Sequence, residues 1–487
     1  MKLILSNNIN RTYVQSLCMA FFHGIKFPQA EEENEDGLEL IVFDQRDDDG
    51  IFLKAKLKHY DKISEKELYY ELSNAESEKR SFKTAVGQVV YQACKDITGK
   101  DIDWGILTGI RPSKVCAEIL CSHSEEETEN ILKEKYLLST EMAKLIIEVA
   151  KNETSIMSLT NDNKCSIYIS IPFCPSRCNY CSFVSYVGKK LFDLIPAYME
   201  KLLNDIRETV CLINDLGMEI SCVYIGGGTP TILTENQLER LLKTISEHID
   251  VDSLDEFTLE GGRPDTITET KLKIAKSYGV NRISVNPQTL NDKVLEKIGR
   301  KHTVNDFLSA FDKVRDSGIR VVNTDLIAGL DGDDFESFKL TVDKIISLNP
   351  SNVTVHTLCV KKSAQLLVDD RGAYDKESDY AQKSVEYALK ALTQNGYAPY
   401  YLYRQKNTVK NLENVGYAKV DSFGLYNVFM MSDAHTVFGI GAGCTTKLVK
   451  NNLKTEILRI FSPKYPYEYL RDNKKNDSKI KEFFDRR

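Results

Sequence analysis

Six short apolar segments, each followed by an amphipathic helical stretch, recur between about residues 164 and 375 and constrain the fold more than any other feature. They are CSIYISI (165–171), ISCVYIG (220–226), EFTLEG (256–261), NRISVN (281–286), IRVVNTDLI (319–327) and SNVTVHTL (351–358). Strands that alternate with helices form parallel sheets, because each helix returns the chain to the start of the next strand. Six such units predict an open or partial β/α barrel, whose functional residues lie at the carboxyl ends of the strands.

The regions on either side of this pattern differ from it. In residues 1–160, LELIVF (38–43) and IFLKAKLKHY (51–60) flank a turn-rich segment and predict a hairpin. A capping box of Ser64 and Glu67 predicts that a helix begins there and runs to about Thr98. We therefore expect an α/β fold: a partial (β/α)6 barrel at 161–375, an α+β N-terminal domain of unknown role at 1–160, and a mainly helical C-terminal region at 376–487.

Charge and hydropathy exclude two classes of partner. The 487 residues include 64 basic and 71 acidic side chains, a net charge of −7, which gives no overall basic surface for nucleic acid. The N-terminus lacks a long apolar stretch, and no run of about 18 apolar residues occurs elsewhere. We expect a cytoplasmic protein with no nucleic-acid partner and no membrane span.

Three of the twelve cysteines stand close together after the first barrel strand, with the spacing C-x3-C-x2-C: Cys174, Cys178 and Cys181. A structural zinc site takes four ligands, usually as two closely spaced pairs, and no second pair stands nearby. Three thiolates on one short loop suit three corners of a four-iron four-sulfur cluster and leave the fourth iron open. The trio is therefore predicted to ligate metal, with a zinc site or incidental buried thiols as the alternatives.

Polar or unusually small residues follow several of the other strands. GGGT (226–229) lets the backbone approach a ligand closely, although three glycines could also form only a tight turn. Glu260 could accept hydrogen bonds from hydroxyl groups, and the fork of Arg300 suits a carboxylate. Gln288 follows a further strand, and Asp325 needs a partner or a ligand because it lies among apolar residues.

The cysteine spacing, placed after the first strand of such a barrel, resembles that of the radical S-adenosylmethionine (SAM) enzymes. The motifs YISIPFCPSRCNYC, YIGGGTPT, TLEGGRPDT, ISVNPQT, IGRKHT and TDLIAGL, in this order, resemble the coproporphyrinogen dehydrogenase family. This family is also called oxygen-independent coproporphyrinogen III oxidase, and it includes heme-chaperone and heme-degrading relatives. WGILTGIRPSK (104–114) in the N-terminal region is most similar to the HemZ-type branch.

The resemblance implies a 4Fe-4S cluster held by the three cysteines and SAM bound at the open iron. It implies these cofactor contacts: Tyr168, Tyr180, Gly226, Gly227, Gly228, Thr229, Glu260, Gln288, Arg300 and Asp325. Among them Glu260 would hold the ribose, Gln288 and Asp325 the adenosine part, and Arg300 the carboxylate. Tyr168 and Arg300 are also the implied catalytic residues.

The implied reaction is oxidative decarboxylation of two propionates of coproporphyrinogen III to vinyl groups, with flavodoxin or ferredoxin as electron donor. Cations for the substrate's carboxylates could come from Arg177, Lys189, Lys190, Arg263 and Lys301, although a solvated surface charge is the simpler interpretation of any single one. The alternatives are a heme chaperone and a radical methyltransferase that opens heme. In the chaperone His302, His356 or His435 could ligate iron, although a hydrogen-bonded structural histidine is the simpler interpretation of each.

Three positions depart from the family pattern and bear on the substrate. Ser170 stands where the family has histidine, Asp331 where it has proline, and Phe183 where decarboxylating members commonly have a fourth cysteine. We expect cofactor cleavage to survive these changes, whereas the coproporphyrinogen reaction depends on them more directly.

Overall fold

A computed structural model describes the chain except for residues 23, 29–36, 72–74, 182–185, 360–379, 406–407, 452–454 and 486–487. The chain divides into two compact units. The first contains Met1–Lys151 together with Leu402–Asn411, and the second contains the remaining described residues. The three-part division of the sequence into 1–160, 161–375 and 376–487 stays a prediction.

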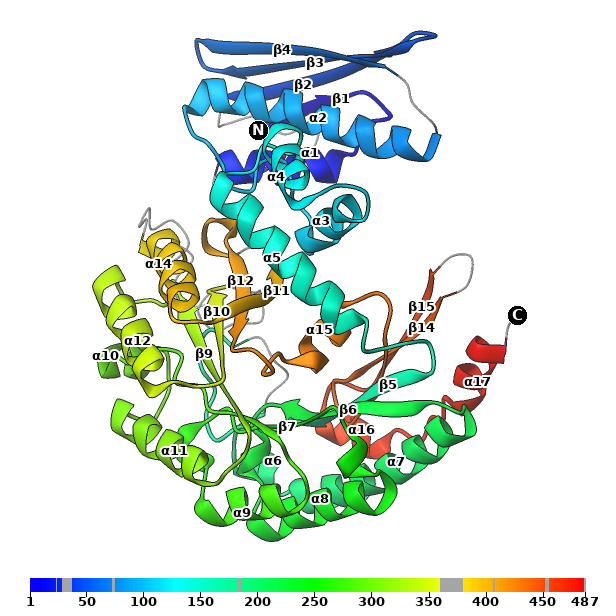
Figure 1. Cartoon of the computed structure of the whole chain (residues 1–487), viewed down its shortest axis with the longest axis vertical. Coiled ribbons are helices and arrows are strands. Elements are labelled where there is room, and N and C mark those ends of the chain that lie inside the picture. Colours follow the sequence, from blue (N-terminus) through cyan, green and yellow to red (C-terminus); the bar gives the residue numbers. More distant parts are fainter. Residues whose placement is uncertain are drawn as a thin grey trace. The chain divides into compact units, whose positions relative to one another are not determined.

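The first unit has a four-stranded sheet covered by helices on one face (Figure 1). Its elements are β1 (Lys2–Leu5), α1 (Arg11–Phe21), β2 (Leu38–Arg46), β3 (Gly50–His59), β4 (Lys62–Glu71), α2 (Ala75–Thr98), α3 (Pro112–Leu120) and α4 (Glu125–Glu134). Helix α5 (Thr140–Met157) begins in this unit and ends in the second. The predicted hairpin is confirmed, because β2 pairs antiparallel with β3 from Leu38 opposite His59 to Arg46 opposite Ile51.

The predicted start of the long helix at Ser64 is wrong. Residues Lys62–Glu71 form β4, which pairs antiparallel with β3 along its whole length. The hydroxyl of Ser64 donates to Asp96 Oδ2 at 2.8 Å instead of capping a helix. From Ser64 onward the side chains of this strand alternate between more buried and more exposed positions, and cross-strand pairing outweighed the local capping signal. The helix α2 begins only at Ala75.

The single tryptophan and the motif around it belong to the core of the first unit. Trp104 is 3% exposed, and the guanidinium of Arg404 lies over its ring at 4.9 Å from the centroid. The backbone N–H of Arg404 also donates to the carbonyl of Ile110 at 2.8 Å. These contacts explain why the short segment Leu402–Asn411 belongs with the N-terminal residues.

The second unit is built on one eleven-stranded sheet. Its strands are β5 (Lys164–Ile171), β6 (Glu219–Gly227), β7 (Glu256–Glu260), β8 (Arg282–Ser284), β9 (Val321–Ala328), β10 (Asn352–Thr357), β11 (Ala398–Arg404), β12 (Glu413–Ala418), β13 (Thr436–Ile440), β14 (Thr445–Asn451) and β15 (Thr455–Phe461). The order is β11-β12-β10-β9-β8-β7-β6-β5-β13-β14-β15, and β5 to β10 run parallel to one another. All six predicted barrel strands are confirmed. The barrel is partial, because β5 and β10 are not paired with each other.

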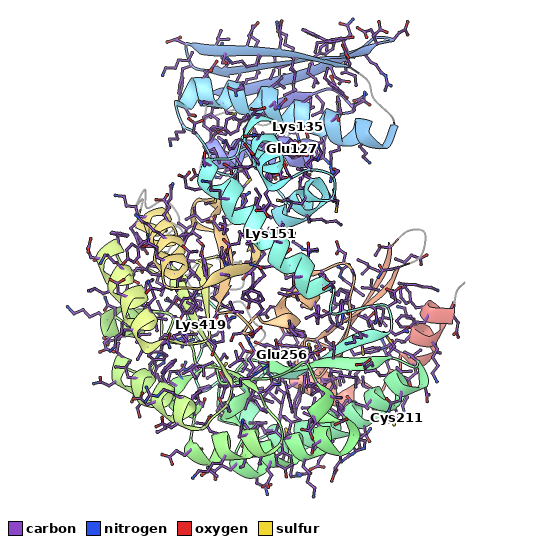
Figure 2. All side chains as sticks on the ribbon, in the orientation of Figure 1. Glu127, Lys135, Lys151, Cys211, Glu256 and Lys419 are labelled. Carbon is purple, nitrogen blue, oxygen red and sulfur yellow. The ribbon has the colours of Figure 1, made fainter. Side chains whose placement is uncertain are left out.

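Helices follow the barrel strands and lie outside the curve of the sheet (Figure 1). The helices of this unit are α6 (Lys189–Phe192), α7 (Ile195–Asp215), α8 (Glu235–His248), α9 (Glu269–Ser277), α10 (Asp292–Lys297), α11 (Val304–Asp316), α12 (Phe335–Leu348), α14 (Tyr380–Gln394), α15 (Leu425–Met431), α16 (Pro466–Arg471) and α17 (Asp477–Asp485). Capping boxes begin two of them: Thr234 with Gln237 at α8, and Thr303 with Asp306 at α11. Glu256 lies within the curved sheet, whereas the exposed Cys211 lies on α7 (Figure 2).

The C-terminal region is mixed rather than mainly helical. Strands β11 and β12 extend one end of the barrel sheet, where β12 is antiparallel to β10. Strands β13 to β15 extend the other end, where β13 runs parallel to β5. The prediction of a mainly helical region was wrong because tyrosine and glycine obscure the alternation of polar and apolar residues that is typical of strands.

Side chains of the barrel strands alternate between two environments. In β5, Ile167, Ile169 and Ile171 are fully buried, whereas Tyr168 is partly exposed. Successive side chains of a strand point to opposite faces, so Tyr168 and Ser170 face one way and the isoleucines the other. This alternation places polar side chains on the inner face of the barrel. Among the described residues, no helix is long and apolar enough to cross a membrane.

Candidate active site

The cysteine loop begins directly after β5 and is shaped by its backbone. The N–H of Cys174 donates to the carbonyl of Tyr186 at 3.1 Å, and the N–H of Tyr186 donates to that of Pro172 at 2.9 Å. A further bond, from the N–H of Cys181 to the carbonyl of Cys178 at 3.1 Å, forms a tight turn. The three predicted ligands are therefore carried by one folded segment at the carboxyl end of the first barrel strand.

No three His, Cys, Asp or Glu side chains within the described ranges are grouped so that they could hold a single metal ion. A four-iron cluster binds each cysteine through a different iron, so its ligands need not converge on one point. The role of the trio as cluster ligands stays a prediction.

Three glycines at the end of β6 allow close contact with this loop. The backbone N–H of Gly228 donates to the carbonyl of Ile171, and that of Thr229 to the carbonyl of Phe173, both at 2.8 Å. A Cβ at residue 228 would lie 2.5 Å from the carbonyl oxygen of Phe173, and residue 227 has a φ of +115°. A larger residue at position 228 would therefore displace the start of the cysteine loop, and one at position 227 would be strained and would meet the end of β5 at Ile171.

Glu260 ends β7 and lies against the first of these glycines. A Cβ on Gly226 would lie 2.7 Å from Glu260 Oε2 and 3.1 Å from the Tyr168 ring. Burial, together with the charge of Asp325, raises the pKa of Glu260 to about 8, although the backbone N–H of Gly227 donates to it. In the structure as it stands, Glu260 is therefore mainly protonated at neutral pH and can donate a hydrogen bond as well as accept one.

Tyr168 belongs to a stack of three tyrosines, two of which the sequence reasoning missed. Its ring centroid is 5.9 Å from that of Tyr224 and 6.0 Å from that of Tyr426, and these last two are 4.6 Å apart. Burial raises the pKa of all three hydroxyls, so they stay protonated. The alternation of Tyr224 with Val223 and Ile225 in β6 was the available signal for an inward-facing side chain.

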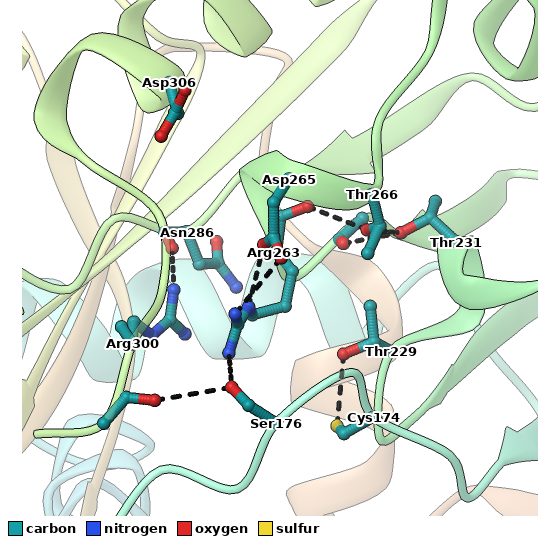
Figure 3. Close-up of polar contacts among 12 residues, drawn as sticks. Cys174, Ser176, Thr229, Thr231, Arg263, Asp265, Thr266, Asn286, Arg300 and Asp306 are labelled. Atoms are coloured by element: carbon teal, nitrogen blue, oxygen red, sulfur yellow. Dashed lines mark hydrogen bonds and ion pairs between the residues drawn. The ribbon is translucent and has the colours of Figure 1, made fainter. Parts of the chain in front are cut away.

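Asn286 links the predicted residues of the later strands and was not predicted. Its Nδ2 donates to Asp325 Oδ2 at 2.7 Å, and its Oδ1 accepts from the backbone N–H of Asp325 at 3.2 Å. Its carbonyl oxygen accepts a hydrogen bond from Arg300 Nη1 (Figure 3). Asp325 Oδ1 accepts from Asn323 Nδ2 at 2.8 Å, so both carboxylate oxygens of this half-buried acid are hydrogen-bonded.

Gln288 and Arg300 each keep a buried polar atom without a hydrogen-bond partner, Gln288 Oε1 and Arg300 Nε. Gln288 also has a φ of +71°, in the left-handed region that a non-glycine residue seldom adopts. The backbone holds this conformation, because the N–H of Gln288 donates to the carbonyl of Asp325 at 3.1 Å. Strain and unpaired buried atoms are typical of residues that await a ligand.

Arg300 also reaches the cysteine loop. Its guanidinium interacts with the hydroxyl of Tyr180 and the thiol of Cys178. Tyr180 and Arg300, two predicted cofactor contacts more than a hundred residues apart, are thus brought together beside one predicted cluster ligand.

The residues present fit the cluster and SAM that the resemblance implies. Three thiols on one loop have the donor chemistry of an iron–sulfur site. The unpartnered atoms of Gln288 and Arg300 and the protonated Glu260 supply the acceptors and donors that a polar cofactor needs. The assignment of each contact to a part of the cofactor stays a prediction.

The predicted substrate cations differ in their surroundings. Arg177, Lys190 and Lys301 are exposed, and the side chain of Lys189 lies outside the described residues. Arg263 is only 3% exposed and pairs with Asp265. It therefore does not belong with the solvated cations at the surface.

The three histidines proposed as iron ligands also differ in their surroundings. His435 is buried, with its ring nitrogens 2.7 Å from Thr160 Oγ1 and 2.8 Å from Ser166 Oγ, as a structural histidine would be. His356, at the end of β10, has Nε2 4.0 Å from Asp325 Oδ2. His302 is 3% exposed with no hydrogen-bond partner for either ring nitrogen, and burial with the charges of Arg300 and Arg263 lowers its pKa to about 3.

Two of the three family departures can be placed. Ser170 is 5% exposed, and its carbonyl accepts from the hydroxyl of Tyr198 at 2.9 Å. Asp331 lies 3.0 Å from the ammonium of Lys297. Phe183 lies outside the described residues.

Comparison with known proteins gives concordant matches. Residues 168–345 match the model of the Radical SAM superfamily. The oxygen-independent coproporphyrinogen-III oxidase-like protein HemZ of Bacillus subtilis is 34% identical over 416 residues, which cover 83% of this chain and 82% of that protein. This likeness extends well beyond the barrel.

Two further matches cover less of the chain. The heme chaperone HemW of Bacillus subtilis is 36% identical over 200 residues, which are 40% of this chain and 51% of the chaperone. The structure of coproporphyrinogen III oxidase (HemN) from Escherichia coli matches with a TM-score of 0.49 at 23% identity, covering 61% of this chain and 67% of that one.

Proposed function

The chain belongs to the radical SAM superfamily and, within it, to the family of oxygen-independent coproporphyrinogen-III oxidase-like proteins that includes HemZ, and on this premise we propose that it is an oxidoreductase acting on a tetrapyrrole. The proposed reaction is oxidative decarboxylation of two propionate side chains of coproporphyrinogen III, which yields protoporphyrinogen IX. The likeness to HemZ over both units supports the tetrapyrrole as substrate class.

One structural observation carries the proposal of radical chemistry. The cysteine loop, the three glycines and Glu260 follow three consecutive parallel strands, β5, β6 and β7, at their carboxyl ends. Arg300 reaches the same loop from beyond β8. A ligand bound at this edge would meet the thiols and the buried polar groups together.

Once bound, the cluster and SAM would supply a carbon radical able to take a hydrogen atom from an unactivated C–H bond. The chain's own part is to orient the cofactor and shield it from water. Arg300 offers its unpaired Nε to a carboxylate, Gln288 offers Oε1 to a donor, and Glu260 can bond to hydroxyl groups. The tyrosine stack of Tyr168, Tyr224 and Tyr426 gives the inner face of the barrel an apolar surface at this point.

In the proposed reaction each propionate loses a hydrogen atom from its β-carbon. The bond to the carboxyl carbon then breaks, CO2 leaves, one electron passes to a one-electron acceptor, and a vinyl group remains. A β-hydrogen of an alkyl chain is not acidic, so a general base could not begin this step.

A heme-binding chaperone is the second candidate, favoured by the likeness to HemW. His356 is the histidine placed best for this role, because it lies beside Asp325 at the carboxyl edge of the barrel and is 28% exposed. A neighbouring carboxylate orients an imidazole for iron.

The two candidates differ in what the reconstituted protein does with each tetrapyrrole. Under strictly anaerobic conditions, the protein with cluster, SAM and a reductant should convert coproporphyrinogen III to a divinyl product. Methionine and 5'-deoxyadenosine should accumulate together with that product. Stoichiometric heme binding that is lost in His356→Ala, without turnover of coproporphyrinogen, would favour the chaperone. A control without SAM should give no product.

A further inference from the structure

Arg263 lies in the loop after β7, and each nitrogen of its guanidinium makes a hydrogen bond within the protein (Figure 3). Its Nε donates to Asp265 Oδ1 at 2.9 Å, and its Nη2 donates to Asp265 Oδ2 at 3.2 Å. Its Nη1 donates to the hydroxyl of Ser176 at 2.8 Å. Because the carboxylate of Asp265 binds Nε and Nη2, the orientation of the guanidinium is fixed, and so is the direction in which Nη1 donates.

Ser176 is the residue through which this arginine reaches the cysteine loop. It stands between Cys174 and Cys178 and is 9% exposed. While its hydroxyl oxygen accepts from Arg263, the hydroxyl donates to the carbonyl of Gly299 at 3.3 Å. One serine therefore joins the cysteine loop to two other loops, those after β7 and after α10.

The turn that contains Gly299 holds the next part of the loop. The backbone N–H of Asn179 donates to the carbonyl of Ile298, and its Nδ2 donates to that of Lys297, both at 3.1 Å. Gly299 has a φ of +78°, and a Cβ there would lie 3.2 Å from the carbonyl oxygen of Arg177. Backbone contacts thus hold one side of the loop, and the side chain of Arg263 holds the other.

We infer that Arg263 is a positioning residue for the cluster: with Asp265 as its anchor, it fixes Ser176 and thereby the spacing of Cys174 and Cys178. The alternative role, binding a substrate carboxylate, does not suit a guanidinium that is 3% exposed and already bonded through all three nitrogens. The inference depends on the cluster loop alone, so it holds whether the substrate is coproporphyrinogen or heme.

Loss of this contact should loosen the loop and speed the loss of iron. Outer groups that orient metal ligands commonly change metal retention by about tenfold to a hundredfold. We expect iron to pass from the anaerobically reconstituted Arg263→Gln variant to a ferrous chelator about tenfold faster than from the wild type. Ser176→Ala should release iron faster too, and the double variant no faster than Ser176→Ala, because Ser176→Ala already removes the contact through which Arg263 acts.

The control is Lys273→Gln, which removes one positive charge from the exposed face of α9, the helix that follows the same loop. It should release iron at the wild-type rate. The electron paramagnetic resonance spectrum of the reduced cluster should broaden in Arg263→Gln and partly recover in Arg263→Lys. A purely structural role would not give this pattern.

Iron release from both Arg263→Gln and Ser176→Ala within about twofold of the wild type, with unchanged spectra, would overturn the inference. A lowered affinity of Arg263→Gln for coproporphyrinogen with unchanged iron release would likewise overturn it, in favour of substrate binding. If Arg263→Gln does not fold, Ser176→Ala alone decides, because it removes only a hydroxyl and leaves the Arg263–Asp265 pair in place.

Discussion

The hydroxyl oxygen of Thr229 lies 3.2 Å from the sulfur of Cys174 and joins the end of β6 to the cysteine loop after β5. Thr229 is 1% exposed, so water does not compete for this contact. If Cys174 is a thiolate ligand, the hydroxyl must be the donor, since a thiolate has no hydrogen to give. The contact then bears on the electronic properties of the cluster as well as on its position.

Hydrogen bonds to cluster sulfurs raise the reduction potential, because they stabilise the extra negative charge of the reduced state. Thr229→Val keeps the shape of the side chain but removes the donor, so the midpoint potential should fall. One hydrogen bond of about 1 kcal/mol corresponds to roughly 40 mV for one electron. A redox titration followed by electron paramagnetic resonance measures the shift, and Thr229→Ser should retain the wild-type potential.

Cys178→Ala should abolish cluster assembly and leave the fold intact. The iron content after reconstitution should fall from about four atoms per chain to near zero, because two cysteines cannot hold the cluster. The far-ultraviolet circular dichroism should be unchanged, since the loop lies outside the strands of the barrel. The matched control is Cys211→Ala, which removes an exposed thiol on α7. Retention of the brown cluster absorbance in Cys178→Ala would contradict the ligand assignment.

Gly226→Ala should weaken SAM binding. The added Cβ would lie 2.7 Å from both Glu260 Oε2 and the Tyr224 ring, so the carboxyl must move from its position. Loss of one well-placed contact should cost about tenfold in the dissociation constant, or about 1.4 kcal/mol. Equilibrium dialysis with reconstituted protein measures it. Gly109→Ala, where a Cβ meets nothing within 4 Å, is the control and should bind as the wild type does.

The stability of the apoprotein should depend on pH through Glu260. Folding raises the pKa of this carboxyl from 4.5 to about 8, chiefly by burial, so between these values the folded protein holds a proton that the unfolded chain releases. The stabilising contribution is complete below pH 4.5 and is lost as the pH rises through about 8.

In urea unfolding experiments, the free energy of unfolding of the wild type should therefore decline relative to Glu260→Gln by at most about 1.4 kcal/mol per pH unit in this window. The exposed Glu239→Gln should follow the wild type throughout. Parallel pH profiles for wild type and Glu260→Gln would show that the carboxyl is not desolvated.

The barrel could be predicted from the sequence because short segments rich in apolar residues, such as CSIYISI, alternate with amphipathic helical stretches. The hairpin of β2 and β3 could also be predicted, because two apolar segments flank a turn-rich one, but the other strands of the flanking regions could not. Lys62–Glu71 carries a capping signal that its pairing with β3 overrides. Strands β12 and β13 join the barrel sheet through β10 and β5, which are distant from them in the sequence.

The candidate site shows the same division. Short motifs identified the cysteines, the glycines and Arg300, because closely spaced cysteines, three successive glycines and an arginine after a strand are uncommon in a sequence. Asn286, Tyr426 and Ser176 could not be found in this way, since an asparagine, a tyrosine or a serine is unremarkable until folding places it beside Asp325, Tyr168 or Arg263. Arg263 shows the reverse case: from the sequence it was either a cation for the substrate or a solvated surface charge, and the structure places it in a buried pair.

The most direct test of the central proposal follows a single hydrogen atom. Coproporphyrinogen III deuterated at the β-carbons of its propionates is incubated anaerobically with reconstituted protein, SAM and a reductant, and the 5'-deoxyadenosine is analysed by mass spectrometry. The proposal predicts one deuterium in the 5'-deoxyadenosine and a vinyl-bearing product. Unlabelled 5'-deoxyadenosine with unchanged coproporphyrinogen would contradict it.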